Sequence, residues 1–511
     1  MKLSLSMIVK NEERFVGGCL ESVADLADEI VIVDTGSNDR TKEIAQGFGA
    51  EVLEFDWCDD FSAARNFSLE HTTGDWVLYL DADERLATAY HQKLRRLISN
   101  GKADAFLLNL KSKIGTSEGA QYHLVSYPRL FRKMKGVKFV GKAHEQITTS
   151  LVASRARIVQ TDIIIEHLGY AQDDEVIIKK ARRNHHLLLS QLETRENYGY
   201  ALYQLGQTEI ILGDVDKGLA RLYEALAAGG FGKSVEASIH SVIAENTFKK
   251  GNYEPALVEC ERSIAAMPEQ SFAYIMRGDI FLALGRYRES MEDYRKALEK
   301  YRSTILLGKS ATAVEPVFDV EILYSKLGRS ASLAGMMQDA KSYLELATRS
   351  NRSERRVAAY LEFLARNKMY SEFLGASAEF LEFENLDWYL RLRSSVLIDT
   401  GDYQGAASIL SRLPEHDKMS LFSLANCRLK LGDLAGADEA FQRAVSVGYC
   451  EPGGMEIFGL LQFKLGKYFD SAQTLSKVVG AEPGNVRAAK ILYAARQLSE
   501  FKNQAIQQSG T

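Results

Sequence analysis

The sequence predicts an α/β domain with a mostly parallel sheet over residues 1–170, a bridging helix over 171–196, and an all-α solenoid over 197–505. Three observations support this fold class. Strand-like and helix-like stretches alternate through the first third of the chain. A spacing of 34 residues recurs in the second half. Proline is scarce, at 7 of 511 residues, which favours long helices.

Composition narrows the classes of function. The chain is too long for one hydrophobic core, and its net charge of −5 argues against nucleic acid as a partner. The five scattered cysteines form no Cys-x-x-Cys pair, which indicates reduced thiols in the cytoplasm. The apolar run over residues 3–9 is too short for a transmembrane segment, and no later run reaches about 18 residues. We therefore expect a cytoplasmic protein without a transmembrane segment.

The first elements alternate in type. Apolar runs predict strands over residues 3–9, 29–33 and 50–55, and the spacing of apolar residues predicts helices over 12–27 and 41–47. This order implies parallel strands with right-handed crossovers. The first strand is not followed by Gly-x-Gly-x-x-Gly, and the chain has no Gly-x-x-x-x-Gly-Lys-Ser/Thr. Dinucleotide and P-loop sites therefore lack support.

The next strand carries the main functional hypothesis. Five apolar residues, 76–80, run directly into Asp81, Asp83 and Glu84. The acids then lie at the carboxyl end of a buried strand, where open α/β sheets bind ligands. In an extended backbone Asp81 and Asp83 point to the same side and make a hard oxygen site for Mg²⁺ or Mn²⁺. The alternative is that Asp83 caps the next helix.

Asp34 also lies at the carboxyl end of a predicted strand. Its carboxylate can accept a hydrogen bond from a base N–H or a ribose hydroxyl. The alternative is a tight turn, since Asp34 is followed by Gly36 and Asn38, in which the side chain bonds its own backbone.

Four blocks make roughly the first 170 residues resemble the family-2 glycosyltransferases with the GT-A fold. They match that family in order and spacing, and they cover residues 6–13, 32–41, 60–66 and 80–84. The resemblance implies an α/β GT-A nucleotide-sugar-binding domain. It also implies an inverting hexosyl- or N-acetylhexosaminyl-transferase, with UDP as the leading nucleotide and a divalent metal, Mn²⁺ or Mg²⁺, as cofactor.

The resemblance assigns roles at the donor site. The residue at Asp34 holds the nucleotide base, and Val9 and Glu12 line the same pocket. Asp81 and Asp83 match the Asp-x-Asp motif of the family, in which Asp83 is the direct metal ligand.

Arg65 matches an arginine that lies near the base and the phosphates in the family. A permanent cation suits a diphosphate. The alternative is a surface ion pair with Asp59 or Asp60.

The later part of the α/β domain is the part that we expect to bind the acceptor. Alternating patterns over residues 103–110 and 121–131 predict strands that line a cleft. The block at 138–145 resembles the acceptor-side block of the family, which implies Glu145 as the base that takes the acceptor's proton, with His144 as the runner-up. The alternative is a structural pair of Glu145 and His144. His167, at the end of a further apolar strand, resembles a third metal ligand; the alternative is a hydrogen-bonded edge residue.

The second half repeats a turn of glycine, a polar residue and often tyrosine between helical stretches. Gly251 and Gly285 are 34 residues apart, as are Gly432 and Gly466. The period resembles tetratricopeptide repeats, and we expect about eight of them from near Asn197. Glycine would supply the left-handed turn within each repeat.

Two segments depart from this pattern. The step from Gly285 to Gly335 is 50 residues, so we expect a loop or a lengthened helix within 301–318. The bridging helix carries a basic cluster at 179–183, which we interpret as a solvated helix face.

The order of the domains, a transferase domain followed by repeats, resembles that of bacterial peptide and protein glycosyltransferases. The leading hypothesis is a transferase that moves a sugar from a nucleotide-sugar to a protein or peptide positioned by the repeats. One alternative is lipopolysaccharide or exopolysaccharide synthesis, and another is a repeat scaffold with a degenerate transferase domain. The sequence does not decide between a monomer and a homo-oligomer.

Overall fold

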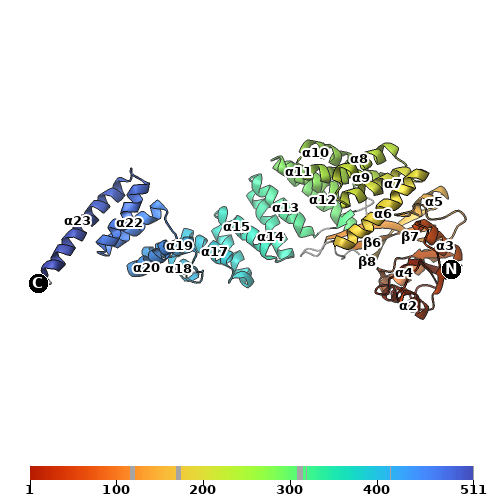
Figure 1. The fold of residues 1–511 in the computed structure, drawn as a ribbon, viewed down its shortest axis with the longest axis horizontal. Coiled ribbons are helices and arrows are strands. Elements are labelled where there is room, and N and C mark those ends of the chain that lie inside the picture. The colour runs from red at the N-terminus through yellow and green to blue at the C-terminus, as the bar shows by residue number, and fades with distance from the viewer. Residues whose placement is uncertain (115–120, 169–173, 308–314, 318, 415, 510–511) are drawn as a thin grey trace. The chain divides into compact units, whose positions relative to one another are not determined.

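The protein is described by a computed structural model that covers residues 1–114, 121–168, 174–307, 315–317, 319–414 and 416–509 (Figure 1). It divides into two compact units, Met1–Tyr343 and Leu344–Thr511. The first unit holds an α/β domain and the helices that follow it, and the second unit is helical. No described helix is long and apolar enough to cross a membrane.

The sheet of the first unit has nine strands in the order β3-β2-β1-β4-β7-β6-β8-β5, with β9 paired to β7. β1, β2, β3 and β4 are parallel, and β4 meets β7 in antiparallel pairing. The strands are β1 Leu3–Val9, β2 Glu29–Asp34, β3 Glu51–Glu54, β4 Trp76–Tyr79, β5 Glu84–Leu86, β6 Ala105–Ile114, β7 Gln121–Arg132, β8 Ile158–His167 and β9 Glu315–Val317.

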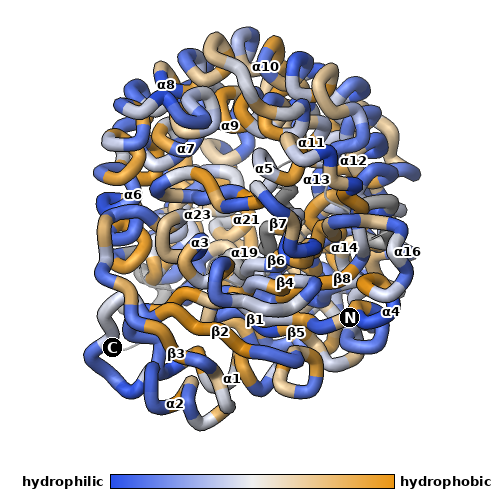
Figure 2. The backbone as a smooth tube through the Cα atoms, turned by 90° about the vertical axis from the view of Figure 1, so that its right-hand side faces the viewer, coloured by the Kyte–Doolittle hydropathy of each residue, from blue (hydrophilic) through white to orange (hydrophobic). Residues whose placement is uncertain are grey.

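The apolar runs form the centre of the sheet, as predicted. β4 is buried throughout its length, and β1 is nearly so, because neighbours cover both faces of a central parallel strand. Figure 2 shows the hydrophobic colour along β1 and β2. Leu5 and Trp76 belong to the main core, together with Leu20 from α1 and Leu94 from α4.

Helices of the α/β domain flank the sheet. They are α1 Val16–Glu21, α2 Thr41–Gly47, α3 Phe61–His71, α4 His91–Ser99 and α5 Thr148–Ala153. The helix expected over residues 12–27 is only six residues long, and turns follow it. Gly17 and Gly18 lie in its first turn, and glycine is a weak helix former. Close packing also favours glycine at position 18, since a Cβ there would lie 2.7 Å from Nη2 of Arg85.

The remaining helices of the first unit pack in sequence. α7 packs on α6 and α8, α9 on α10, and α11 on α12. Their bounds are α6 Asp174–Thr194, α7 Tyr198–Ile211, α8 Val215–Ala228, α9 Lys233–Lys249, α10 Tyr253–Ala266, α11 Phe272–Ala283, α12 Tyr287–Leu307 and α13 Val320–Leu333. α6 occupies the segment in which the bridging helix was expected.

The second unit continues the pattern of paired helices. α15 packs on α16, α17 on α18, α19 on α20, and α21 on α22. The bounds are α15 Glu354–Arg366, α16 Tyr370–Glu379, α17 Asp387–Thr400, α18 Tyr403–Leu410, α19 Lys418–Lys430, α20 Leu434–Ser446, α21 Pro452–Lys464, α22 Tyr468–Ala481 and α23 Val486–Ser509; α14, Met337–Ser350, contains the division between the units.

The predicted turn glycines adopt the left-handed conformation. Gly251, Gly285, Gly432 and Gly466 have φ between 72° and 82°. Lys368 takes the same conformation without glycine, at φ 56°. The long step after Gly285 contains a lengthened α12 and then β9, and β9 joins the sheet of the α/β domain. The expected loop within 301–318 lies partly outside the described residues.

Candidate active site

The carboxyl ends of β1 and β2 meet at one edge of the sheet. Val9 and Asp34 are register partners, and the carbonyl of Val9 accepts hydrogen bonds from the backbone N–H and the hydroxyl of Thr35, at 3.0 and 3.1 Å. The N–H of Glu12 donates to Thr41 Oγ1 at 2.7 Å. The segment after β1 is therefore tied to the start of α2, and Val9 and Glu12 lie beside Asp34.

Asp34 forms the predicted tight turn and keeps one carboxylate oxygen without a partner among the described residues. Its Oδ1 accepts hydrogen bonds from the backbone N–H groups of Gly36 at 3.0 Å and Ser37 at 2.8 Å, which is the turn geometry. Its Oδ2 is buried and has no hydrogen-bond partner among the described residues. Since buried polar atoms are almost always paired, Oδ2 has an open capacity to accept a hydrogen bond.

The backbone after β4 is not extended, and the expectation that Asp81 and Asp83 point to the same side is wrong. β4 ends at Tyr79, and residues 81–84 form a turn in which the N–H of Glu84 donates to the carbonyl of Asp81 at 3.0 Å. A turn breaks the alternation of side chains that a strand would impose. Asp81 consequently faces two arginines, and Asp83 faces His167.

Arg65 is buried and bridges two predicted site residues. Its Nη2 donates to Asp81 Oδ1 at 2.6 Å, and its Nε donates to Glu145 Oε1. Its guanidinium also lies over the rings of Tyr79 and Phe139, at 5.2 and 5.6 Å. The alternative, a surface ion pair of Arg65 with Asp59 or Asp60, does not form. Asp60 instead caps α3, because its Oδ1 accepts from the N–H of Ala63.

The two arginines around Asp81 decide its protonation. Burial acts to raise the pKa of Asp81, but the guanidiniums of Arg65 and Arg129 outweigh burial and hold that pKa below its ordinary value. Asp81 is therefore ionised across the physiological range, and both of its oxygens are already engaged by cations.

Asp83 and His167 lie together, and His167 is hydrogen-bonded through both ring nitrogens, which is the arrangement of the alternative interpretation. His167 Nε2 is 3.1 Å from Asp83 Oδ2, because β5 and β8 pair with Glu84 opposite His167. His167 Nδ1 is 3.0 Å from Ser112 Oγ, which sets the orientation of the ring. Among the described residues, no group of three or more His, Cys, Asp or Glu side chains is arranged to hold a metal ion.

The neighbourhood of Asp83 nevertheless suits a cation. Burial raises the pKa of Glu12 to about 7, and the negative charges of Asp83, Asp81 and Asp39 add to that shift, while Lys180 opposes it. Glu12 therefore lies in a partly buried place close to the negative charge of Asp83. One carboxylate and one imidazole nitrogen are also ligand types that Mn²⁺ and Mg²⁺ sites can use. The residues present therefore fit a divalent cation that takes further oxygen ligands from a bound diphosphate.

Glu145 and His144 do not form the structural pair that was the alternative. Glu145 turns toward Arg65, whereas His144 has a left-handed backbone, at φ 54°, and its Nε2 lies 3.3 Å from Asn184 Nδ2 on α6. Glu145 is thus the one of the two that lies beside the Arg65–Asp81 pair.

Comparisons with known proteins identify the family of the chain. The family described as glycosyl transferase family 2 matches residues 4–161, and the tetratricopeptide repeat matches residues 273–300. A TPR repeat-containing protein of Synechococcus elongatus is 31% identical over 306 residues, which are 57% of this chain and 75% of that protein. The chain belongs to the family-2 glycosyltransferases that carry tetratricopeptide repeats.

Two further likenesses are narrower. The SPbeta prophage-derived glycosyltransferase SunS of Bacillus subtilis is 27% identical over 217 residues, which are 42% of this chain and 50% of that protein. S. aureus TarS, residues 1–349 in complex with UDP, shares 18% identity with a TM-score of 0.30, over 59% of this chain and 92% of that one. Together with the family match, the likeness to SunS supports a role in glycosyl transfer.

Two further buried residues beside these side chains, Arg129 and Glu84, were given no individual role from the sequence. Arg129 on β7 is buried, donates from Nη2 to Glu84 Oε1 at 2.5 Å, reaches Asp81 Oδ2 at 3.4 Å, and lies 4.3 Å over the ring of Tyr79. Its Nε and Nη1 are buried and have no partner among the described residues. Glu84 is fully buried, and its Oε2 accepts from the N–H of Asp81 at 2.9 Å. The available signal was an arginine, Arg129, beside the apolar pair Leu130 and Phe131 of β7.

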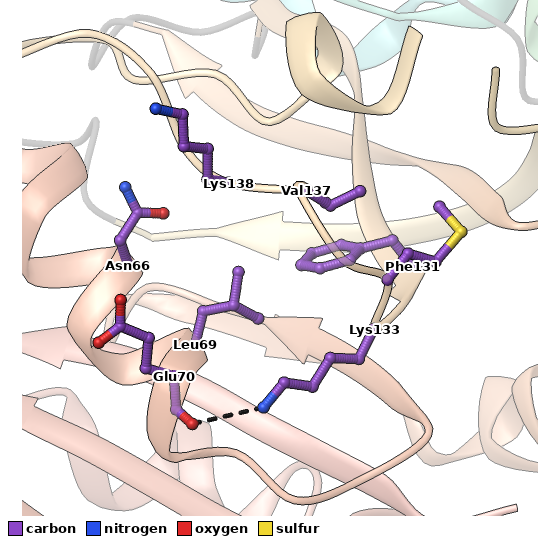
Figure 3. A pocket seen from close by; sticks show the side chains of 8 residues that line it. Asn66, Leu69, Glu70, Phe131, Lys133, Val137 and Lys138 are labelled. Atoms are coloured by element: carbon purple, nitrogen blue, oxygen red, sulfur yellow. Dashed lines mark hydrogen bonds between the residues drawn. The ribbon is translucent and has the colours of Figure 1, made fainter. Parts of the chain in front are cut away.

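A separate hollow lies beside α3. It has a volume of about 220 Å³ and is lined by Asn66, Leu69, Glu70, Phe131, Lys133, Met134, Val137 and Lys138 (Figure 3). Lys133 donates to the carbonyl of Glu70 at 3.4 Å, and Asn66 is bonded to the backbone of Phe139. The hollow is lined by none of the predicted site residues.

Proposed function

We propose that the protein transfers a sugar from a nucleotide-sugar, with UDP as the leading nucleotide, to a protein or peptide acceptor, with inversion and with the help of Mn²⁺ or Mg²⁺. One observation carries this proposal. Side chains from the ends of β2, β4 and β8, from α3 and from the loop before α5 converge at one edge of the sheet. They are Asp34, Asp81, Asp83, His167, Arg65 and Glu145.

The donor would lie along this edge. Asp34 Oδ2, the buried acceptor without a partner, would receive an N–H of the base. Val9 and Glu12 would line the same pocket. Arg65 would keep a permanent positive charge near the diphosphate, since a guanidinium does not deprotonate at neutral pH.

Asp83 and His167 would hold the divalent cation. When bound, such a cation stabilises the negative charge that develops on a departing nucleoside diphosphate. Asp81 would act less directly, because Arg65 and Arg129 already bind its oxygens. Its contribution would be to orient Arg65 and the 81–84 turn that carries Asp83.

Inversion requires a base on the acceptor side. Glu145 would accept the proton of the acceptor nucleophile as that atom attacks the anomeric carbon, with His144 as the second candidate. Arg65 bonds Oε1 of Glu145, and none of the described residues bonds Oε2. Oε2 would then be the oxygen that takes the proton.

The repeats would bind the acceptor. Tetratricopeptide repeats present extended surfaces that suit peptide segments. The free cysteines, which include the buried Cys19, Cys260 and Cys427, suit a reducing compartment such as the cytoplasm.

The first test is calorimetric titration of the protein with UDP, with and without Mn²⁺. We expect Mn²⁺-dependent binding in the wild type, and at least about tenfold weaker binding in Asp83→Asn, because the amide loses the negative charge that attracts the cation. Asp162→Asn is the matched control: Asp162 lies on β8 like His167, but it is exposed and pairs with Lys93.

Two results would contradict the proposal. One is the absence of UDP binding under every condition, which would favour a scaffold or a different nucleotide. The other is an Asp83→Asn protein that binds UDP and Mn²⁺ as the wild type does. With a sugar donor in hand, the anomeric configuration of the product tests inversion directly.

A further inference from the structure

The loop that carries Glu145 is held from two sides. Val140 and Gln146 exchange two backbone hydrogen bonds, N–H of Val140 to the carbonyl of Gln146 at 3.0 Å and the reverse at 2.9 Å. The loop between them therefore has a closed base. On one side, Asn66 of α3 holds the loop by two hydrogen bonds. Asn66 Nδ2 donates to the carbonyl of Phe139 at 2.9 Å, and Asn66 Oδ1 accepts from the N–H of Phe139 at 2.7 Å.

The other side is held by α6, the first helix after the α/β domain. The side chain of Gln191 is buried, and its Oε1 accepts the backbone N–H of Lys142 at 2.9 Å. That N–H has no other partner among the described residues. Removing a buried acceptor leaves its donor unsatisfied, so this contact fixes the loop more firmly than its single hydrogen bond suggests.

α7 supplies the second polar contact. The Tyr200 hydroxyl accepts hydrogen bonds from Gln146 Nε2 and, at 2.8 Å, from Gln204 Nε2. Gln146 directly follows Glu145. Burial raises the pKa of Tyr200 to about 12, so the hydroxyl stays neutral and the contact persists at any physiological pH.

Apolar packing completes the contact. Ala143, one residue before His144, is buried in a cluster with Leu187 and Leu188 of α6 and Leu205 of α7. Phe61 at the start of α3 packs against the same cluster, and its N–H donates to the carbonyl of Lys142 at 3.0 Å. The loop is thus enclosed between α3, which supplies Arg65, and the α6–α7 pair.

We propose that Gln191 and Tyr200 are positioning residues for transfer: they hold the loop so that Glu145 meets both Arg65 and the acceptor. The α6–α7 pair is then part of the catalytic site and not a separable acceptor-binding module. This inference rests on the proposed function, in which Glu145 is the base. A base displaced by about 1 Å can lose on the order of a hundredfold in rate.

The test compares Tyr200→Phe and Gln191→Ala with a matched control, Tyr203→Phe. Tyr203 lies one turn further along α7 and is buried with Leu222 and Ile239; its ring packs edge-on against that of Tyr200 at 5.8 Å, and none of the described loop residues bonds its hydroxyl. Gln191→Glu is the conservative variant, since it keeps an acceptor for the Lys142 N–H. Amide hydrogen exchange of residues 139–147 and UDP affinity are measured in each protein.

The kinetic probe is Mn²⁺-dependent release of UDP from UDP-glucose or UDP-N-acetylglucosamine, with water as the acceptor. We expect faster exchange in the loop and a kcat about tenfold lower or more in Tyr200→Phe and Gln191→Ala. The donor KM and the affinity for UDP should stay within about twofold of wild type. Tyr203→Phe should match wild type, and Gln191→Glu should recover part of the loss.

Glu145→Gln separates this inference from the proposed function. We expect Tyr200→Phe to cause no further loss in a Glu145→Gln background, because residues that act through one group are not additive. Full activity of Glu145→Gln would refute Glu145 as the base. An inactive Glu145→Gln together with a fully active Tyr200→Phe would refute the positioning role alone.

Unchanged loop exchange in Tyr200→Phe and Gln191→Ala would also overturn the positioning role. If the wild type releases no UDP from either donor, the proposed function fails, and the exchange rates still decide whether α6 and α7 hold the loop.

Discussion

At the residue scale, the site consists of paired charges and of a few buried polar atoms that have no hydrogen-bond partner among the described residues. Arg65 is shared between Asp81 and Glu145, and Arg129 pairs with Glu84. Asp34 Oδ2 and two nitrogens of Arg129 remain buried without partners among the described residues. A buried polar group without a partner is costly, so proteins retain one chiefly where it has a function.

Glu29 provides a pH-dependent prediction outside the site. Its carboxylate accepts hydrogen bonds from the N–H and hydroxyl of Thr73, at 2.7 and 2.5 Å, from Lys2 Nζ at 2.9 Å, and from Ser4. Burial acts to raise the pKa of Glu29, but the donors of Ser4, Thr73 and Lys2 outweigh it and lower the pKa from 4.5 to about 2. The folded state therefore gains stability from this ion above pH 4.5, and the gain is lost as the pH falls toward 2.

We expect Glu29→Gln to lower the free energy of unfolding by about 1–3 kcal/mol at pH 7, and the difference from wild type to shrink between pH 4.5 and 2. Thermal unfolding followed by calorimetry across this range is the measurement. Glu51→Gln on β3 is the control, because Glu51 is exposed. A difference between Glu29→Gln and wild type that does not change with pH would contradict the assignment.

At the scale of elements, sequence patterns predict strands and helices well and their ends poorly. The strands around 3–9, 29–33 and 76–80 formed because they are apolar and β-rich. The turn at 81–84 could not be read from the same pattern, because Asp, Ala and Glu suit strand ends and turns alike. What sets it is the buried pairing of Glu84 with Arg129, a residue 45 positions away.

Helix packing in the repeats gives an element-scale prediction. A Cβ at Gly278 on α11 would lie 2.6 Å from the ring of Tyr294 on α12, and that ring is fixed by a 2.5 Å hydrogen bond from its hydroxyl to Asp279. We expect Gly278→Ala to destabilise the protein by about 1–3 kcal/mol, because the core cannot accept the added methyl group. Calorimetric unfolding is the measurement.

Gly375 on α16 is the matched control, since it is also helical but a Cβ there would meet nothing within 4 Å. Gly375→Ala should stabilise its helix by up to about 1 kcal/mol. Equal effects of the two substitutions would show that helix packing at Gly278 is looser than the structure indicates.

At the scale of the whole molecule, the compact units do not follow the boundary between sheet and repeats. The first unit runs to Tyr343, so it contains the α/β domain and several helical pairs. β9, from the long step between repeats, pairs with β7 of the sheet, and α6 and α7 enclose the Glu145 loop. The domain limits 1–170, 171–196 and 197–505 stay predictions from the sequence pattern.

This organisation predicts where the chain can be shortened. A chain of residues 1–351, which keeps all of α14, should unfold cooperatively and bind UDP with Mn²⁺ like the full chain. A chain of residues 1–168 should aggregate or unfold at a much lower temperature, because the loss of α6 and α7 exposes Ala143 and leaves the Lys142 N–H unsatisfied. Size-exclusion chromatography and thermal melts compare the two, and a stable, UDP-binding 1–168 chain would contradict the prediction.

The sequence by itself determined the α/β class, the helical repeats, the carboxyl-end positions of Asp34, Asp81 and Asp83, and the likeness to family-2 glycosyltransferases. These features rest on local periodicity and on short motifs, which are visible along the chain. Only the tertiary structure decided that Asp81 belongs to two arginines, that Asp83 meets His167, and that Gln191 and Tyr200 hold the Glu145 loop. Those contacts join residues 16 to 84 positions apart, from Arg65 and Asp81 to Asp83 and His167, and depend on strand register and helix packing, which no local pattern encodes.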